Sequence, residues 1–122
     1  MSVKIITVAK ELPEYSRKTA EILPFLDVWL SDQDDRFVRK VKKIFEGAQV
    51  DQRYSIMQPE EVFTKTSFEE RNQIYAREVI ILGEKVLNTA LKQANWNPKE
   101  LDYIITVSCT GIMIPSLDAY LI

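Results

Sequence analysis

Histidine is absent from this 122-residue sequence. Histidine is the side chain most often used for general acid–base chemistry near neutral pH, so its absence argues against such catalysis by this chain alone. A nucleophilic cysteine normally needs a neighbouring base of this kind to form its thiolate. We therefore do not expect the chain by itself to carry out Cys–His chemistry.

Cysteine is nearly absent as well. The single cysteine, Cys109, allows neither an internal disulfide bond nor a zinc site built from several cysteines. The sequence has no apolar run long enough to span a bilayer, and its N-terminus lacks the apolar region of a secretory signal. These absences favour a cytoplasmic protein with no membrane partner.

The sequence also has no excess of basic residues. Sixteen lysines and arginines stand against 18 aspartates and glutamates, which gives a net charge of −2. A nucleic-acid-binding domain would require a basic excess, so nucleic acid is not an expected partner. The hydrophobic share, 46%, is that of a globular protein, and residues 1–122 are predicted to form one domain or part of one.

The pattern of apolar residues predicts alternating strands and helices. Residues 3–8 and 103–107 are rich in β-branched and aromatic side chains, so both are expected to be buried strands, and residues 50–57 alternate as a third. A helical pattern starts at Ser16, and at Pro24 either the helix kinks or a second helix begins. This order of elements predicts the α/β class.

Residues 36–46 form the clearest amphipathic helix of the sequence. Their apolar residues fall on one face, while Arg36, Lys40 and Lys43 fall on the opposite face, one above another. A row of cations spaced by about one helical turn can bind phosphate groups. The same row can also be a solvated basic face, and the spacing alone leaves both interpretations open.

A second helix is predicted to be long and buried. Ser67 and Glu70 have the spacing of a capping box, and the helical pattern continues to about Ala94. Residues 79–82 are apolar on every side, so we expect this helix to be covered all round and to lie between two sheets. Gly83 costs about 1 kcal/mol in a helix relative to alanine, and we interpret it as a site of close approach by another backbone.

The last residues combine small side chains with the start of another helix. Residues 108–111 are small, and Pro115 and Ser116 introduce an apolar pattern that reaches Ile122. Because a strand, turn and helix place reactive groups at the edge of an α/β sheet, Cys109 is a candidate nucleophile, against the simpler interpretation of a small buried thiol. The chain stops within this apolar helix, so we expect it to be the leading part of a longer protein.

Three segments resemble the N-terminal part of the chalcone synthase-like, type III polyketide synthases, especially the bacterial ones. The segments are residues 40–45 leading to 52–54, residues 67–75, and Ser108-Cys109-Thr110-Gly111-Ile112-Met113-Ile114-Pro115-Ser116-Leu117-Asp118-Ala119-Tyr120. The last segment is the most specific, because it combines a Thr-Gly turn, a Pro-Ser helix start and the Asp-Ala-Tyr that follows. The resemblance covers most of the chain, which would be less than half of such an enzyme.

The resemblance implies a thiolase-like fold in which the long buried helix lies next to a mixed sheet. It implies an acyltransferase that condenses malonyl-CoA units onto a starter acyl-CoA and works as a homodimer. No organic or metal cofactor is implied beyond the CoA of the substrates. The nucleophilic cysteine, histidine and asparagine of the family are expected downstream of Ile122, so this chain contains no catalytic residue and is expected to be inactive alone.

Site residues follow from the resemblance position by position. Lys40 and Lys43 fall on positions that bind the CoA phosphates, and a third such position is Gly47 here. Cys109 falls on a position that lines the acyl cavity rather than on the nucleophile, and Thr110 lies beside it. Ile114 falls on the position that crosses the dimer into the partner's cavity.

Two alternatives differ in their chemistry. The first is another thiolase-fold condensing enzyme, related to ketoacyl synthase III or HMG-CoA synthase, which the turn at residues 109–115 disfavours. The second is a non-catalytic α/β dimerisation module, which the absence of histidine favours and the apolar helix near Ile122 disfavours.

Overall fold

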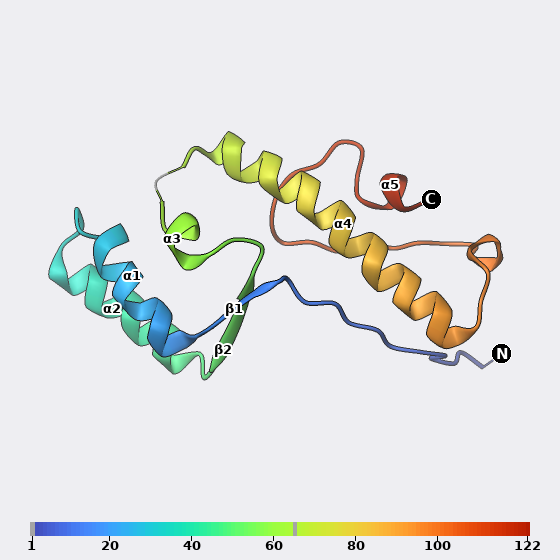
Figure 1. The fold of residues 1–122 in the computed structure, drawn as a ribbon, viewed down its shortest axis with the longest axis horizontal. Helices are drawn as coiled ribbons and strands as arrows, with labels where there is room; N and C mark the ends of the chain where they lie inside the picture. Colours follow the sequence, from blue (N-terminus) through green and yellow to red (C-terminus); the bar gives the residue numbers. More distant parts are fainter. Residues whose placement is uncertain (1, 65) are drawn as a thin grey trace. The chain divides into compact units, whose positions relative to one another are not determined.

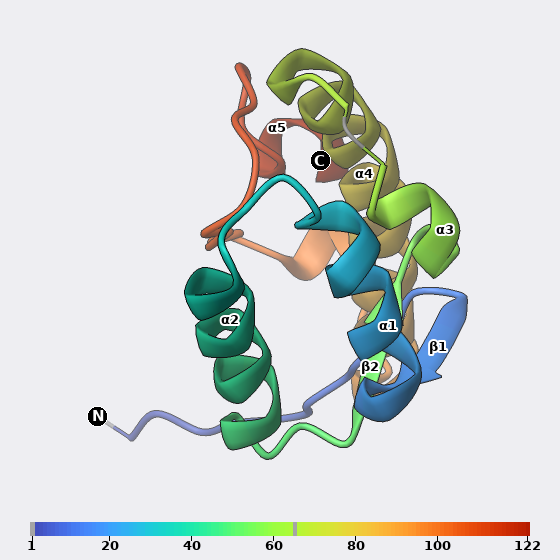
Figure 2. The same cartoon turned by 90° about the vertical axis from the view of Figure 1, so that its left-hand side faces the viewer.

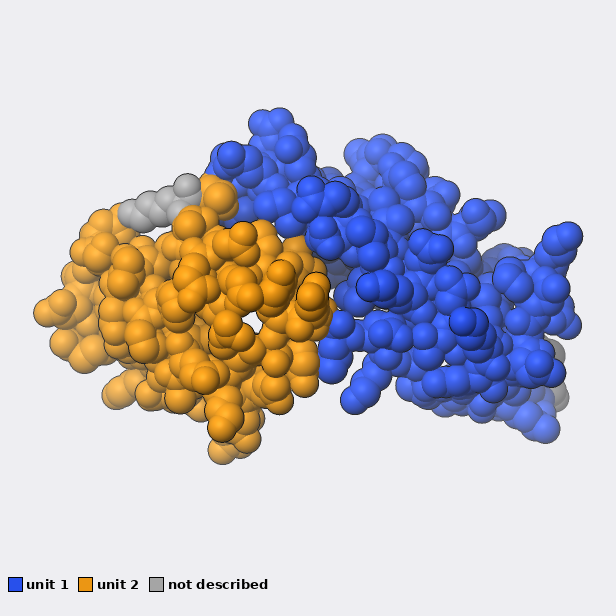
Figure 3. Space-filling view, viewed as in Figure 1, with its two compact units in different colours: residues 1–12, 67–122 blue, residues 13–66 orange. Residues whose placement is uncertain are grey.

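The computed structural model describes residues 2–64 and 66–122. The chain divides into two compact units, one formed by Met1–Leu12 with Ser67–Ile122 and the other by Pro13–Thr66 (Figure 3). The elements follow in the order β1, α1, α2, β2, α3, α4, a 3-10 turn at Pro98–Glu100, and α5 (Figure 1). This mixture of helices and sheet confirms the predicted α/β class.

The unit formed by Pro13–Thr66 contains three of the helices. Helix α1 (Thr19–Trp29) runs through Pro24 as one element, and α2 (Asp35–Gly47) packs beside it (Figure 2). Asp34 caps α2 by accepting the Phe37 amide at 2.9 Å. A salt bridge between α2 and α1 joins Lys42 Nζ to Asp27 Oδ1 at 2.5 Å. The short helix α3 (Pro59–Val62) completes the unit.

A two-stranded antiparallel sheet accompanies these helices. Strands β1 (Tyr15–Lys18) and β2 (Gln52–Ser55) pair so that Arg17 lies opposite Arg53. The strand predicted within residues 50–57 is thereby confirmed, whereas β1 was not predicted. Because β1 is a strand only through its pairing with the distant β2, the local pattern at Ser16 suggested a helix start three residues too early.

The core of this unit is small and comes mainly from one face of α1, with Pro59 of α3 buried as well. Ile22, Leu26 and Leu30 are buried, with Leu26 only 1% exposed, and Thr19 is buried on the same face. Hydrogen bonds fix both the backbone and the side chain of Thr19. Its amide donates to the Asp51 carbonyl at 2.8 Å, and its hydroxyl accepts from Arg53 Nε at 3.2 Å. These bonds tie the start of α1 to β2.

The other unit is built on α4 (Phe68–Ala94). The predicted capping box at its start is confirmed: Ser67 Oγ accepts the Glu70 amide at 3.1 Å, and Glu70 Oε2 accepts the Ser67 amide at 2.8 Å. Asn95 ends the helix in the left-handed conformation, with φ of 55°. Helix α5 (Asp118–Leu121) follows Pro115 and Ser116, as predicted, and it lies against α4.

The predicted burial of α4 on all sides is wrong for the described residues. Ile81 is 44% exposed, and Leu91 is the only residue of this helix that is buried. The neighbours of Gly83 are also different from those expected. A Cβ atom at this position would lie 3.5 Å from the Leu121 side chain and 3.6 Å from the Leu117 side chain, so side chains rather than another backbone approach it.

Two predicted strands are extended segments that belong to no sheet. Residues 3–8 and 103–107 pair with no other strand among the described residues, so the only sheet there is the antiparallel pair β1–β2 rather than a mixed sheet. Their apolar pattern favours a strand, but a strand also needs the backbone groups of a neighbour. Apolar side chains of both segments are left exposed, with Val3 at 92% and Val107 at 93%.

Instead of joining a sheet, the N-terminal segment lies along the C-terminal half of α4. Thr7 Oγ1 donates to Gln93 Oε1 at 2.9 Å, and Thr89 Oγ1 donates to Glu11 Oε1 at 2.8 Å.

None of the helices in residues 2–64 and 66–122 is both long enough and apolar enough to cross a membrane.

The capping box makes stability depend on pH. Hydrogen bonds from the Ser67 backbone and hydroxyl lower the pKa of Glu70. Because the folded pKa lies below the unfolded value of about 4.3, this contribution is present above that value and is lost as pH falls through the folded pKa. In Glu70→Gln, urea unfolding between pH 6 and 3 should show a smaller acid-induced loss of stability. The same change at the next residue, Glu69→Gln, should leave the loss intact; equal losses in both variants would contradict this assignment.

Candidate functional site

The predicted phosphate-binding residues lie on the exposed side of α2. Arg36, Lys40 and Lys43 are spaced by four and three residues, so they share one face of the helix, and all three are exposed. Lys42 lies on another side, where it pairs with Asp27. The three cations are therefore presented together to solvent, where they can reach an anionic ligand. Their phosphate-binding role stays a prediction.

The second predicted site is the turn at residues 108–111, in the unit that contains α4. Ser108 Oγ donates to the Thr110 carbonyl at 2.7 Å and accepts from the Thr110 amide at 3.2 Å, which closes the turn. With its proton used in this way, Ser108 accepts the Tyr75 hydroxyl at 2.7 Å. Tyr75 lies on α4, so this contact fixes the turn to the helix.

Gly111 is required by both conformation and space. Its φ of 74° lies in the left-handed region, which L side chains seldom adopt. A Cβ atom at this position would lie 2.0 Å from Tyr75 Cδ1, far inside van der Waals contact. The ring of Tyr75 therefore packs directly on the backbone of the turn, and only glycine allows this.

Asn72 holds the residue that follows this glycine. Its Oδ1 accepts the Ile112 amide at 2.7 Å, and its Nδ2 donates to the Ile112 carbonyl at 2.8 Å. One side chain thus satisfies both backbone groups of Ile112, as a neighbouring strand would. The turn is fastened to α4 at two points, Tyr75 and Asn72.

This double hydrogen bond predicts a local change in hydrogen exchange. In Asn72→Ala, the Ile112 amide loses its acceptor, and its exchange with deuterium should become at least tenfold faster, which corresponds to about 1.4 kcal/mol. In Asn72→Asp, the acceptor remains while the donor is lost, so protection of this amide should fall less. Equal protection in wild type and Asn72→Ala would show that another group covers the amide.

Asp118 closes the other end of the segment. Its Oδ1 accepts from Ser116 Oγ at 2.5 Å and from Thr106 Oγ1 at 3.2 Å. The bond from Ser116, with smaller contributions from the Asp118 backbone amide and Thr106, lowers the pKa of the Asp118 carboxyl. The ionised carboxylate thereby links the start of α5 to the extended segment that precedes the turn.

A cavity of about 430 Å³ lies between the turn and α4. Its lining includes Tyr75, Val79, Thr106 and Thr110. Cys109 is not among the lining residues and is exposed, so the expected burial of its thiol is wrong for the described residues. Burial in a turn depends on neighbours from elsewhere in the fold, and both Cys109 and Thr110 are exposed here, although Thr110 borders the cavity.

The remaining predicted residue, Ile114, is 93% exposed. An isoleucine this exposed is available to a partner surface, but its role across a dimer stays a prediction.

The sequence analysis missed Asn72 and Tyr75 as residues that hold the turn. Their spacing of three on the predicted helix was a usable signal, because it places both on one face. No group of three or more His, Cys, Asp or Glu side chains is placed to hold a metal ion in the described part of the chain.

Known proteins are similar to this chain in both sequence and fold, although no family model matches it. The chain is 37% identical over 82 residues to 1,3,6,8-tetrahydroxynaphthalene synthase of Streptomyces griseus, and 30% identical over 81 residues to phloroglucinol synthase of Pseudomonas fluorescens. The crystal structure of 1,3,6,8-tetrahydroxynaphthalene synthase from Streptomyces coelicolor, a bacterial type III polyketide synthase, matches 93% of this chain with a TM-score of 0.78 and 30% identity. The chain is similar in sequence and fold to the N-terminal part of bacterial type III polyketide synthases.

The match to type III polyketide synthases covers only part of those proteins. The sequence alignments include 67% and 66% of this chain but 22% and 23% of the two relatives, and the structural match covers 32% of the solved chain. The chain therefore spans about a fifth to a third of the length of these synthases. The resemblance to type III polyketide synthases and the thiolase-like fold, predicted from residues 40–45, 67–75 and 108–120, are confirmed.

Proposed function

We propose that this chain is the N-terminal part of an acyltransferase that condenses malonyl-CoA units onto a starter acyl-CoA. The observation that carries the proposal is the match of nearly the whole chain to a type III polyketide synthase, at a TM-score of 0.78. Two further synthases that differ in their named product also align with two thirds of the chain. The chemistry common to such enzymes, rather than one product, is what this similarity supports.

Within that enzyme, this chain contributes binding surfaces rather than catalytic groups. The exposed row on α2 supports a role for Lys40 and Lys43 in binding the CoA phosphates. The cavity beside the turn supports Thr110 as part of the acyl cavity wall, whereas Cys109 does not line this cavity and is assigned to that wall by the resemblance alone. Ile114 is the residue that reaches a second copy in a homodimer. The cysteine nucleophile and its histidine and asparagine partners belong to residues outside this chain.

The reaction itself can be tested on the whole protein. Each decarboxylative condensation releases one CO₂ and one CoA from malonyl-CoA as the acyl chain grows. With malonyl-CoA and a starter acyl-CoA, we expect a cyclised product such as a pyrone, one CO₂ for each malonyl-CoA consumed, and one CoA more than CO₂ per product molecule, because the starter also releases its CoA. Release of CoA without CO₂ would instead favour another thiolase-fold chemistry.

The phosphate role of α2 predicts a change in substrate affinity. In the whole protein, Lys40→Ala combined with Lys43→Ala should raise the KM for malonyl-CoA by about five- to thirtyfold, which corresponds to roughly 1–2 kcal/mol for two exposed charge contacts. The kcat should change little, because these contacts are the same in the ground state and the transition state. Steady-state kinetics at several malonyl-CoA concentrations separates the two constants.

A matched control removes two lysines from the other unit. Lys85 and Lys92 lie on α4 and are exposed, so Lys85→Ala with Lys92→Ala makes the same change in net charge. If the KM rises equally in both double variants, the effect comes from net charge rather than from the α2 face. An unchanged KM in the α2 variant would remove the phosphate role.

A further inference from the structure

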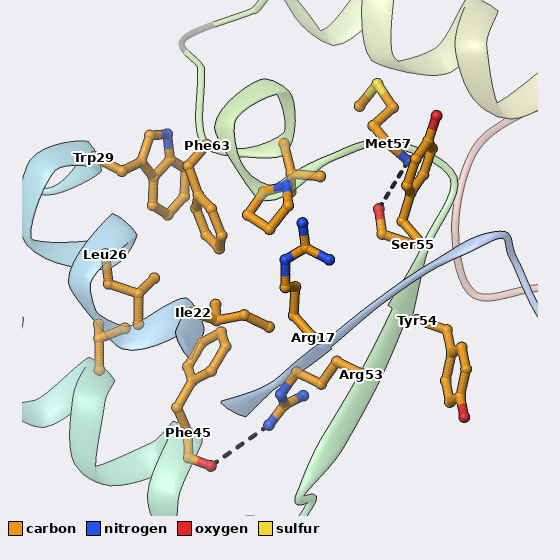
Figure 4. A pocket seen from close by; sticks show the side chains of 14 residues that line it. Arg17, Ile22, Leu26, Trp29, Phe45, Arg53, Tyr54, Ser55, Met57 and Phe63 are labelled. Carbon is orange, nitrogen blue, oxygen red and sulfur yellow. Dashed lines mark hydrogen bonds between the residues drawn. The ribbon is translucent and has the colours of Figure 1, made fainter. Parts of the chain in front are cut away.

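The unit formed by Pro13–Thr66 contains a cavity of its own, of about 490 Å³ (Figure 4). Helices α1, α2 and α3 and both strands contribute to its wall. Most of its lining is apolar and includes Ile22, Leu26, Phe45, Met57 and Phe63. This volume and character are those of a small-molecule site, which is usually an apolar cavity with a few polar groups.

Two arginines supply the charge of this cavity. Arg17 and Arg53 are directly opposite each other in the β1–β2 ladder, so both project from the same face of the sheet, and both line the cavity. In Figure 4, the guanidinium of Arg17 extends from β1 towards the middle of the cavity, whereas that of Arg53 is directed towards Phe45. The guanidinium carbon of Arg53 lies 4.7 Å from the centre of the Phe45 ring.

Neutral groups hold both arginines in place. Arg17 donates to the Ser16 carbonyl at 2.9 Å and to Gln58 Oε1 at 2.8 Å. Arg53 donates to Thr19 Oγ1 at 3.2 Å and to the Phe45 carbonyl at 3.5 Å. A guanidinium has more N–H donors than these bonds use, so each arginine keeps donors for a ligand.

No carboxylate neutralises this pair among the residues that the structure describes. The cavity lining contains no aspartate or glutamate, and the salt bridges Lys42–Asp27 and Arg77–Glu78 involve neither arginine of the cavity. Like charges placed directly opposite on a two-stranded sheet destabilise it. Two positive charges at an apolar cavity therefore favour a ligand that brings one anionic group and an apolar body.

We propose that this cavity binds a small amphipathic carboxylate, with its carboxylate on Arg17 and Arg53 and its hydrocarbon part against α1, α2 and α3. Paired guanidinium groups suit a carboxylate, because its two oxygens can accept several N–H bonds at once. Val41 and Phe45 line the cavity from the side of α2 opposite to Lys40 and Lys43. The site is therefore separate from the proposed CoA contact and does not depend on it.

Calorimetric titration of the full chain with decanoate, and separately with decanol, tests this site. The two probes share their hydrocarbon chain and differ in the charged group. We expect saturable decanoate binding and at least tenfold weaker decanol binding. Arg17→Gln should weaken decanoate binding at least tenfold, whereas Lys18→Gln, which removes one charge from an exposed position of the same strand, should change it less than twofold.

Several results would overturn the proposal. These are the absence of saturable decanoate binding, equal binding of decanoate and decanol, or equal weakening by Arg17→Gln and Lys18→Gln. If Arg17→Gln does not fold, as judged by circular dichroism, the comparison of the two probes on the unmodified chain decides alone. An unchanged KM for malonyl-CoA in the α2 double variant would contradict the phosphate role of α2 but not the carboxylate site, so the two proposals can fail independently.

Discussion

Gly111→Ala should destabilise the chain by about 2–5 kcal/mol. A left-handed conformation costs an L residue roughly 1–2 kcal/mol, and overpacking costs roughly 1–3 kcal/mol more. Both costs apply here, because φ is 74° and the new methyl group would lie 2.0 Å from the Tyr75 ring. Urea unfolding measures the change, and the protection of the Ile112 amide shows whether the turn has left α4.

Gly47→Ala is the matched control for this substitution. A Cβ atom at Gly47 would meet nothing within 4 Å, and this glycine lies in α2. Alanine there should raise the free energy of unfolding by up to about 1 kcal/mol. If Gly111→Ala proved as harmless as Gly47→Ala, the contact with Tyr75 would not exist in solution.

A double variant separates the clash from the backbone cost. Tyr75→Ala removes the ring that the new methyl group would strike, so Gly111→Ala should cost less in that background than in wild type. The free-energy changes of substitutions at two residues in direct contact do not add, and the difference between the cost of Gly111→Ala in the two backgrounds measures the coupling of the two residues. Purely additive effects would assign the whole loss to the positive φ of Gly111.

Leu26→Ala should cost about 2–5 kcal/mol, the second large effect. Leu26 is 1% exposed and borders the cavity of the Pro13–Thr66 unit, so its truncation enlarges an existing void instead of leaving a space that neighbours can fill. The buried apolar residues of this unit are few, and they include Ile22 on the same helix and Leu30 directly after it. Thermal and urea unfolding should both report the loss.

Val28→Ala provides the control on the same helix. Val28 is 76% exposed, so its truncation should change the free energy of unfolding by less than about 0.5 kcal/mol. A large loss from both variants would mean that α1 is stabilised by helix formation rather than by its buried face. A small loss from both would mean that the core around Leu26 is not packed in solution.

The sequence by itself determined the elements whose causes are local. The capping box of Ser67 and Glu70, the amphipathic pattern of residues 36–46 and the start of α5 are each set by residues within a few positions of one another. Their helices were predicted to within a few residues. Likewise, the small residues of the turn at 108–111, with Pro115 after them, marked the segment that carries the family resemblance.

Only the tertiary structure decided which extended segments pair. β1 is a strand because β2 lies beside it, while residues 3–8 and 103–107 have stronger strand patterns but no ladder among the described residues. Propensity describes how a side chain fits a pleated surface, but hydrogen-bonded pairing requires a second backbone that lies elsewhere in the sequence. For this reason, the sheet in the part of the chain that the structure describes is the antiparallel pair β1–β2 and not the predicted mixed sheet.

The contacts of the two sites were likewise decided by the tertiary structure. The ring of Tyr75 on Gly111, the bonds of Asn72 to Ile112 and the opposition of Arg17 and Arg53 all join residues that are far apart in the chain. Sequence patterns reveal periodicity within an element, and this periodicity predicted the basic face of α2. Distances between elements depend on packing and pairing, which the order of residues within any one element does not contain.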